Sequence, residues 1–258
     1  MNTIRPSLFV LGLWLLSPLV VEASEPTVLR LLAYNIHHGE GTDQKLDLER
    51  IAAVITDLKP DLVALQEVDK IVQRTGRVDQ AETLEKLTGM KSAFGKFMDY
   101  QGGEYGMALL SKHPIKSVTN HRLPSGAEPR SALAATVLLG ESKQELVFVS
   151  IHLYRTEQER YAQAAKLVEI YKDHTSPVIL AGDFNSRPNS KPLNLFAKSW
   201  HIPDKGKDRL TFSAMRPFQE IDYIMLRPKE RFEVVESRVI DVPVVSDHRP
   251  VLLVVRLK

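Results

Sequence analysis

Hydrophobic and polar positions recur along this chain with two spacings, which predict a succession of strands and helices. Residues 27–34 form an apolar run typical of a strand. Apolar positions then repeat near helical spacing over residues 46–58 until Pro60 stops the pattern, and residues 61–65 form a second short strand. The opening segment therefore predicts a strand–helix–strand unit in which a polar group follows each strand.

The rest of the chain is predicted to contain more strands than helices. Two more helices are expected over residues 80–88 and 157–171, with a polar stretch around 100–104 and a loop over 200–209. The further strands are expected at residues 105–110, 115–123, 132–139, 145–151, 178–181, 221–226, 232–239 and 251–257. This mixture predicts an α/β fold with two packed sheets and helices on the outside.

The first 23 residues are predicted to be a signal peptide. Arg5 precedes an apolar run over residues 8–21, which is short for a membrane-spanning helix of about 20 apolar residues. An uncleaved N-terminal anchor is the alternative, and cleavage near Ala23 or Ser24 is favoured. We therefore expect a single domain over residues 24–258, exported to the periplasm or secreted, without an integral membrane segment after cleavage.

Composition narrows the class of protein further. The chain has no Cys, which excludes both a disulfide scaffold and a lipoprotein anchor. Its net charge of +2 is too small to hold a polyanion by electrostatics alone, so a nucleic-acid partner is possible but not favoured. We expect a monomer.

Three short motifs in the last third of the chain carry acid, amide and imidazole groups. They are Gly-Asp-Phe-Asn at residues 182–185, Ile-Asp-Tyr-Ile at 221–224 and Ser-Asp-His-Arg-Pro at 246–250, each after or inside a predicted strand. Polar groups at strand ends of an α/β protein tend to converge on one crevice. Asp, Asn and His without Cys suit Mg²⁺ or Mn²⁺ and a bound phosphate. These motifs favour a hydrolase of phosphate esters.

Two polar residues follow the first two strands and are candidate metal ligands. Glu67 can bind Mg²⁺ directly, since this ion takes one or two protein carboxylates and fills its other positions with water and phosphate oxygen. Asn35 lies at the end of the neighbouring strand, and Asp247 is a further candidate ligand. The alternative for Glu67 is an exposed position after a strand.

Asp183 and Asn185 form a pair two residues apart after a strand. If the backbone is extended there, both side chains project to the same side and could position an attacking water beside phosphate oxygens. The alternative is an Asx turn that closes the strand.

Asp222 and His248 are predicted to pair. The carboxylate would orient the imidazole and favour its protonated form, which could stabilise phosphorane charge, whereas the neutral ring could act as a base toward water. His152, at the end of another strand, is a candidate donor to a non-bridging phosphate oxygen. Arg130 is either a phosphate clamp or an exposed loop residue. Tyr105 either lines the substrate site or is half-buried packing.

Together these residues resemble the endonuclease/exonuclease/phosphatase superfamily, which has the DNase I-like fold. Seven motifs match in order, around Asn35, Glu67, residues 105–111, His152, residues 182–185, Asp222 and residues 246–250. The resemblance implies a four-layer sandwich of two mixed β-sheets flanked by helices. It also implies Mg²⁺-dependent hydrolysis by in-line attack of water.

The resemblance assigns a role to each matching residue. Glu67 holds the metal, with Asn35 and Asp247 assisting near it. Asp183 and Asn185 handle water and phosphate, and Asp222 pairs with His248. His152 matches a position that carries His in the DNase-like and phosphatase branches but Tyr in the AP-endonuclease branch, which argues against a base-excision repair enzyme.

Two positions depart from the family pattern. His37 stands where AP endonucleases carry an Asp ligand, and Met107 replaces the Asn that commonly follows Tyr-Gly. The first removes one metal ligand of that branch, and the second leaves the contribution of that strand to the site open.

Three functions remain open at this point. The favoured one is an exported phosphodiesterase or phosphatase for a small or lipid-linked substrate; the others are a secreted nuclease and a non-catalytic binding module on the same fold. A nuclease would need a basic groove, but Lys and Arg are spread along the chain. A sphingomyelinase-like enzyme would need an exposed aromatic hairpin, which is not predicted because Trp200 stands alone. Residues 42–45, 72–80, 97–104 and 188–209 are expected to form the loops that select the substrate.

Overall fold

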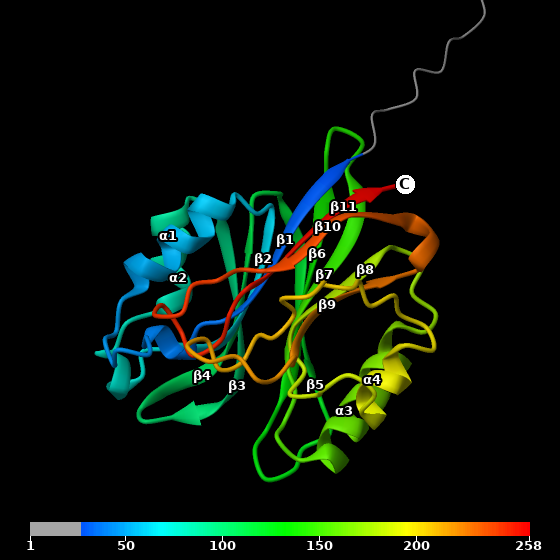
Figure 1. The fold of residues 1–258 in the computed structure, drawn as a ribbon. Helices are drawn as coiled ribbons and strands as arrows, with labels where there is room; N and C mark the ends of the chain where they lie inside the picture. Colours follow the sequence, from blue (N-terminus) through cyan, green and yellow to red (C-terminus); the bar gives the residue numbers. More distant parts are fainter. Residues whose placement is uncertain (1–26) are drawn as a thin grey trace, which may run out of the picture.

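The computed structural model describes residues 27–258, and in this part of the chain two β-sheets and four α-helices form four layers (Figure 1). The sheets pack face to face, helices α1 and α2 lie against the outer face of the first sheet, and α3 and α4 lie against the outer face of the second. This confirms the predicted α/β sandwich of two mixed sheets flanked by helices. The predicted signal peptide, residues 1–23, lies outside the described residues.

The first sheet has six strands with one parallel pair. Its strands follow the order β10 (Phe232–Val239), β11 (Val251–Leu257), β1 (Val28–Asn35), β2 (Leu62–Lys70), β4 (Gly103–Ser111) and β3 (Lys91–Tyr100). Strands β1 and β2 are parallel and are joined by α1 (Leu48–Leu58), while every other neighbouring pair is antiparallel. The predicted strand–helix–strand unit is therefore present.

The second sheet repeats this arrangement with five strands. Their order is β5 (Ile115–Arg122), β6 (Ser131–Leu139), β7 (Gln144–His152), β8 (Val178–Asp183) and β9 (Asp222–Arg227). Strands β7 and β8 are parallel and are joined by α3 (Glu157–Tyr171). Each sheet thus sends the carboxyl ends of two adjacent strands toward the same end of the molecule.

Apolar side chains fill the three spaces between the layers. Phe148 and Leu253 belong to the cluster between the sheets, Leu167 and Phe184 to the cluster under α3, and Ile55 to the cluster under α1. Each is fully buried, which stabilises the fold by roughly 1.5–3 kcal/mol per side chain. The strand ends are therefore held by a rigid frame on both sides.

Three of the helices begin with the same capping device. Asp47, Asp79 and Thr156 each accept a hydrogen bond from the backbone N–H three residues later, at 3.0, 3.1 and 3.4 Å. A cap of this kind contributes about 1 kcal/mol. Helix α2 (Gln80–Thr88) ends at Gly89, whose φ of 70° suits glycine. These signals explain why α2 occupies the predicted residues.

Among the α-helices and strands of the described residues, two were not predicted. Strand β3 lies at a sheet edge, and the polar residues Lys91, Lys96 and Asp99 obscure its pattern. Helix α4 (Lys191–Phe196) is a single short helix inside a segment expected to be a loop. None of the described helices has the length and apolar character needed to cross a membrane.

Candidate active site

The register of the second sheet places three of the predicted site residues in one row. His152 ends β7, Asp183 ends β8 and Asp222 begins β9. His152 pairs with Asp183 across the parallel strands, and Asp183 pairs with Asp222 across the antiparallel strands. Directly paired residues project from the same face of a sheet, so the three side chains lie next to one another. All three are buried.

His248 joins this row from the loop before β11. Its Nδ1 lies 3.0 Å from Oδ2 of Asp222, and its Nε2 lies 3.8 Å from Oδ2 of Asp183. The backbone N–H of His248 donates to Oγ of Ser246 at 3.3 Å, and that hydroxyl donates to the backbone oxygen of Asn35 at 2.8 Å. The imidazole is thus fixed between two carboxylates, as the predicted Asp222–His248 pair requires.

The charges in this row are set by burial and by the neighbouring groups. Burial disfavours the imidazolium, but Asp222, Asp183 and Asp247 outweigh it and raise the pKa of His248 to about 10. Burial and the carboxylate of Asp222 raise the pKa of Asp183 to about 7, although His248 opposes this shift. At neutral pH His248 is a cation, and Asp183 titrates in the range suited to a general base.

His152 lies on the other side of Asp183 and is neutral. Its Nε2 is 3.4 Å from Oδ2 of Asp183. Burial, and then the charge of Arg130, lower the pKa of His152 well below its usual range. Its buried Nδ1 has no hydrogen-bond partner among residues 27–258. The ring therefore adds no charge to the cavity, and its Nε2 is the nitrogen that faces Asp183.

The backbone after β8 forms a turn, not the extended conformation considered from the sequence. The N–H of Asn185 donates to Oδ1 of Asp183 at 2.7 Å, and Asn185 has a left-handed φ of 48°. The Asx-turn alternative is therefore correct for the backbone, and both side chains nevertheless line the cavity. The side-chain amide of Asn185 also donates to the backbone oxygen of Leu153 at 2.9 Å, which fixes the residue at the edge of the site.

Glycine is required directly before this turn because its φ is positive and both the neighbouring strand β7 and the first sheet lie close to it. Gly182 has a φ of 142°, and a Cβ there would lie 2.1 Å from the backbone oxygen of Ile151 and 2.8 Å from Nε2 of Gln66. No larger residue fits without moving backbone. Gln66 uses the space to donate to Oγ of Ser150 at 3.0 Å, which ties the first sheet to the second beneath the site.

A β-bulge aims Glu67 into the site. The pairing of β2 with β4 shifts register between Gln66 and Val68, and Glu67 has a left-handed φ of 58°. Since side chains alternate along a regular strand, Glu67 would otherwise point to the face opposite Gln66. The bulge instead turns the carboxylate into the cavity that contains Asp183 and His248.

The groups around Glu67 fit a hard divalent cation. The amide of Asn35 donates to Oε1 of Glu67 at 3.2 Å and to Oδ2 of Asp183 at 3.3 Å, which links the two sheets. In the described part of the chain, neither Glu67 nor Asp247 forms an ion pair with a basic side chain. Half-buried carboxylates without a cationic partner are the oxygen ligands that Mg²⁺ and Mn²⁺ prefer.

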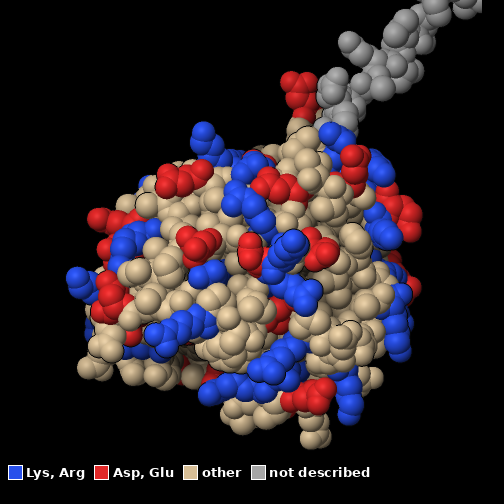
Figure 2. All heavy atoms as spheres, viewed as in Figure 1, with Lys and Arg blue, Asp and Glu red and all other residues tan. Residues whose placement is uncertain are grey.

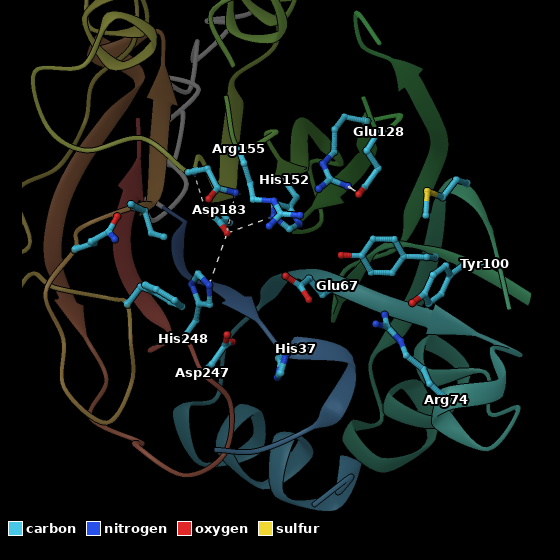
Figure 3. A pocket seen from close by; sticks show the side chains of 17 residues that line it. His37, Glu67, Arg74, Tyr100, Glu128, His152, Arg155, Asp183, Asp247 and His248 are labelled. Atoms are coloured by element: carbon cyan, nitrogen blue, oxygen red, sulfur yellow. Dashed lines mark hydrogen bonds and ion pairs between the residues drawn. The ribbon is translucent and has the colours of Figure 1, made fainter. Parts of the chain in front are cut away.

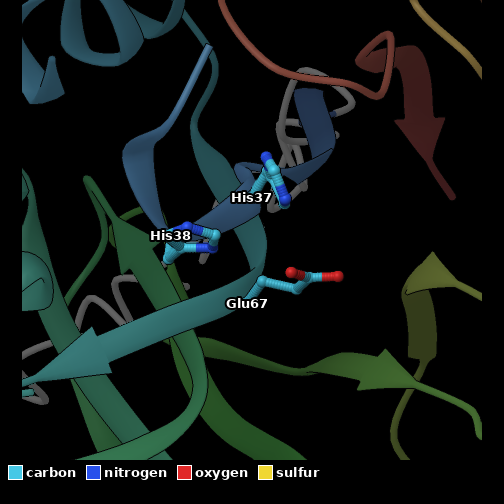
Figure 4. A group of neighbouring side chains, drawn as sticks. All are labelled: His37, His38 and Glu67. Carbon is cyan, nitrogen blue, oxygen red and sulfur yellow. The ribbon is translucent and has the colours of Figure 1, made fainter. Parts of the chain in front are cut away.

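Among residues 27–258, two groups of three His, Asp or Glu side chains have ligand atoms within 4.8 Å of one another. One consists of His37, His38 and Glu67 (Figure 4). The other is Asp183, Asp222 and His248, but its imidazole is protonated and already bound to Asp222. Glu67 lines the cavity and has no basic partner among residues 27–258, so the Glu67 side is the candidate metal site.

A cavity of about 500 Å³ joins the two groups (Figure 3). Its walls contain eight of the predicted site residues, namely Glu67, Tyr105, Arg130, His152, Asp183, Asn185, Asp247 and His248. Asn35 and Asp222 lie behind the wall and are hydrogen-bonded to residues within it. The structure therefore brings all ten together.

Arg130 and Tyr105 are both fixed in the cavity wall. Arg130 is buried, pairs with Glu128 and lies 4.9 Å above the ring of Phe97, so it is not an exposed loop residue. Tyr105 is half-buried; burial and the charge of Glu67 raise its pKa well above the usual range, so it remains a neutral phenol.

Nine further lining residues were not predicted as site residues. They are His37, Arg74, Met98, Tyr100, Glu128, Arg155, Phe212, Gln219 and Ile221. Arg74, Met98 and Tyr100 belong to residues 72–80 and 97–104, which were expected to select the substrate. The sequence therefore indicated these three lining residues through the position of their loops, and not through the chemistry of any single residue.

Comparison with known proteins places the chain in a family. The family model for the Endonuclease/Exonuclease/phosphatase family matches residues 32–248, and the chain belongs to this family. This confirms the resemblance found from the seven motifs.

Three curated relatives are similar over part or most of their length. The uncharacterized protein YbhP of Escherichia coli is 27% identical over 213 residues, which are 77% of this chain and 84% of that protein. Protein cwh43 of Schizosaccharomyces pombe is 26% identical over 66% of this chain and 18% of its own length. An inositol phosphosphingolipids phospholipase C of Saccharomyces cerevisiae is 24% identical over 45% of this chain and 30% of its own length.

Solved structures share the fold. A family protein from Bacteroides thetaiotaomicron superposes with a TM-score of 0.77 and 19% identity, covering 91% of this chain and 99% of that one. A mannosyl-6-phosphatase from the same species gives a TM-score of 0.72 and 18% identity, covering 89% and 99%. The superfamily thus includes phosphoester hydrolases on this scaffold.

Proposed function

We propose that this protein is an exported, divalent-metal-dependent phosphodiesterase that acts on a small or lipid-linked phosphoester by in-line attack of water. One observation carries the proposal. A buried network of Asp183, His248 and Asp222 faces the carboxylate of Glu67, which has no basic partner among residues 27–258, across a single cavity. A base, a fixed cation and a candidate metal ligand are thus assembled around one space.

The residues of the chain divide the chemistry between them. Asp183, once ionised, accepts a proton from the attacking water, which Asn185 helps to orient. His248 carries a positive charge toward the phosphate oxygens, and Asp222 maintains that charge. Glu67, assisted by Asp247 and Asn35, would hold Mg²⁺ (or Mn²⁺), which when bound neutralises charge on a phosphate oxygen. His152 offers a neutral ring to a non-bridging oxygen.

The size of the cavity and the surface charge favour a small substrate over a nucleic acid. A cavity of about 500 Å³ is within the range of small-molecule sites. On the face shown in Figure 2, Lys and Arg are interspersed with Asp and Glu, unlike the basic track that several phosphates would require. A secreted nuclease is therefore less favoured and is the second candidate.

A loop at the cavity supports a lipid-linked substrate. Phe212 and Gln219 line the cavity and pair with each other, and between them Met215 and Phe218 are each 57% exposed. Exposed apolar side chains beside a site can contact a lipid surface. Trp200, on which the sequence-based expectation rested, is 4% exposed and belongs to the core, so the exposed apolar residues beside the cavity are those of the 212–219 loop.

Hydrolysis of bis-p-nitrophenyl phosphate by residues 24–258 tests the proposal. The rate should depend on Mg²⁺ or Mn²⁺, vanish with EDTA and be lost in His248→Ala. If the folded protein shows no release from this diester at any metal concentration, the phosphodiesterase proposal is wrong, and a phosphomonoesterase or a non-catalytic binding module takes its place. We expect the active species to be a monomer, which size-exclusion chromatography with light scattering would test.

A further inference from the structure

The cavity has a second wall that the proposed chemistry does not use. This wall consists of Arg74, Met98, Tyr100 and Tyr105. Figure 3 shows Arg74 and Tyr100 on the side of Glu67 away from His248. If the phosphate of an ester lies between Glu67 and His248, one of its alcohol groups can extend to this wall. The wall is therefore placed to contact that alcohol group.

The side chain of Arg74 in this wall is held in place by a carboxylate that also neutralises its charge. It lies in the 3-10 helix η2 (Gln73–Thr75), and its Nε and Nη2 donate to the two carboxylate oxygens of Asp69 at 2.7 and 2.9 Å. Asp69 is fully buried. The pair is neutral overall, so it does not attract an anion strongly. Nη1 of Arg74 makes no hydrogen bond to the described residues and remains available to a neutral acceptor.

The guanidinium also holds the two tyrosines in place. Its central carbon lies 4.9 Å from the ring centre of Tyr100 and 5.3 Å from that of Tyr105. The two rings are 6.1 Å apart and inclined at 52°. The wall therefore presents two fixed phenol groups and a guanidinium N–H, together with aromatic surface.

This combination matches a hydroxylated ring better than a second phosphate. A ring hydroxyl can exchange hydrogen bonds with a phenol or accept one from a guanidinium N–H, and the C–H face of the ring packs on aromatic surface. A phosphate would instead favour an Arg without a carboxylate partner. Arg155 is such a residue: it lines the cavity and forms no ion pair within the described part of the chain.

We propose that Arg74, Met98, Tyr100 and Tyr105 form a subsite for a hydroxylated six-membered ring, a hexose or a cyclitol, that is esterified to the phosphate. This inference rests on the proposed function and names the substrate class of the same site. The loop containing η2 and the β3–β4 hairpin are then the elements that select the substrate.

Three phosphodiesters that differ in one alcohol test the subsite: glycerophosphoinositol, glycerophosphomannose and glycerophosphoethanol. Their hydrolysis can be followed by ³¹P NMR in wild type, Tyr100→Ala and Arg74→Lys. We expect wild type to prefer at least one of the two ring esters over the ethanol ester by about tenfold or more in kcat/KM. Both variants should lower this ratio about three- to tenfold, because each removes part of the contact surface.

Tyr161→Ala is the matched control, since Tyr161 is 45% exposed on α3, outside the cavity. Its ratio should equal that of wild type, and thermal melting should show that all variants are folded. A preference for inositol or for mannose identifies the ring. Equal rates on all three esters, or a ratio unchanged in both variants, would overturn the subsite while release from bis-p-nitrophenyl phosphate still supported the proposed function. Loss of all hydrolysis by wild type would instead count against the function itself.

Discussion

The two acid clusters that face each other across the cavity are built in opposite ways. On the second sheet, Asp183 and Asp222 are buried and share the imidazolium of His248. On the other side, Glu67 of β2 and Asp247 of the loop before β11 are partly exposed and form no ion pair in the part of the chain that the structure describes. The cluster of Asp183 and Asp222 thus contains its own cation, the imidazolium of His248. The carboxylates of Glu67 and Asp247 need a cation from solution.

The backbone reflects the same difference. Asp183 and Asp222 of the buried cluster lie at paired strand positions, whereas Glu67 and its neighbours His37 and His38 are left-handed, with φ of 58°, 46° and 44°. Such conformations cost of order 1 kcal/mol or more each and persist where the surrounding structure enforces them. The buried side thus fixes the charges before substrate arrives, and the open side fixes the position of a ligand whose partner is supplied later.

The largest effect should come from breaking the buried cluster. Asp183→Asn removes the base and the second carboxylate next to His248, so kcat/KM on bis-p-nitrophenyl phosphate should fall by about 10³–10⁴. Excess Mg²⁺ should not restore the rate, because the lost group is not the candidate metal ligand. Asp173→Asn is the control, with a side chain 87% exposed beyond the end of α3. Recovery of the Asp183→Asn rate by added metal would contradict the division between the clusters.

Breaking the open cluster should have a smaller effect that metal can reverse. Glu67→Gln keeps the shape of the side chain but removes its charge, so at limiting Mg²⁺ the rate should fall about 10- to 100-fold. Titration should show the half-maximal metal concentration raised by a similar factor, with most activity regained at saturation. An unchanged metal requirement would show that Glu67 does not hold the metal.

Asp222→Asn should produce a smaller effect that depends on pH. Asp222 is the main group that raises the pKa of His248 to about 10, so His248 should lose its proton at lower pH in the variant. We expect about a tenfold loss near neutral pH and an alkaline limb of the kcat/KM profile that begins at lower pH. The acid limb should also move down, since Asp222 raises the pKa of Asp183. A pH profile identical to that of wild type would show that Asp222 does not control the ionisation of His248.

The buried cluster could be predicted from sequence better than the open one. Asp183, Asp222 and His152 terminate or begin apolar strands, so strand pattern and family motifs both locate them. The direction of the Glu67 side chain depends on a β-bulge, and the position of His37 depends on a left-handed backbone conformation. The spacing of hydrophobic residues encodes neither feature. Strand β3 was missed because edge strands carry polar residues, and with it the substrate wall around Tyr100 could not be assembled.

The smallest effect should be the stabilisation of the protein by metal alone. A ligand at 100 times its Kd stabilises the folded state by about 2.7 kcal/mol, which corresponds to a rise in Tm of roughly 5–10 °C for a protein of this size. Mg²⁺ should raise the Tm of wild type and of Asp222→Asn equally, because Asp222 lies behind the cavity wall and is not a candidate metal ligand. Glu67→Gln should show little or no rise at the same concentration. The reverse result, a rise kept by Glu67→Gln and lost by Asp222→Asn, would place the metal in the buried cluster and would require His248 to give up its proton on binding.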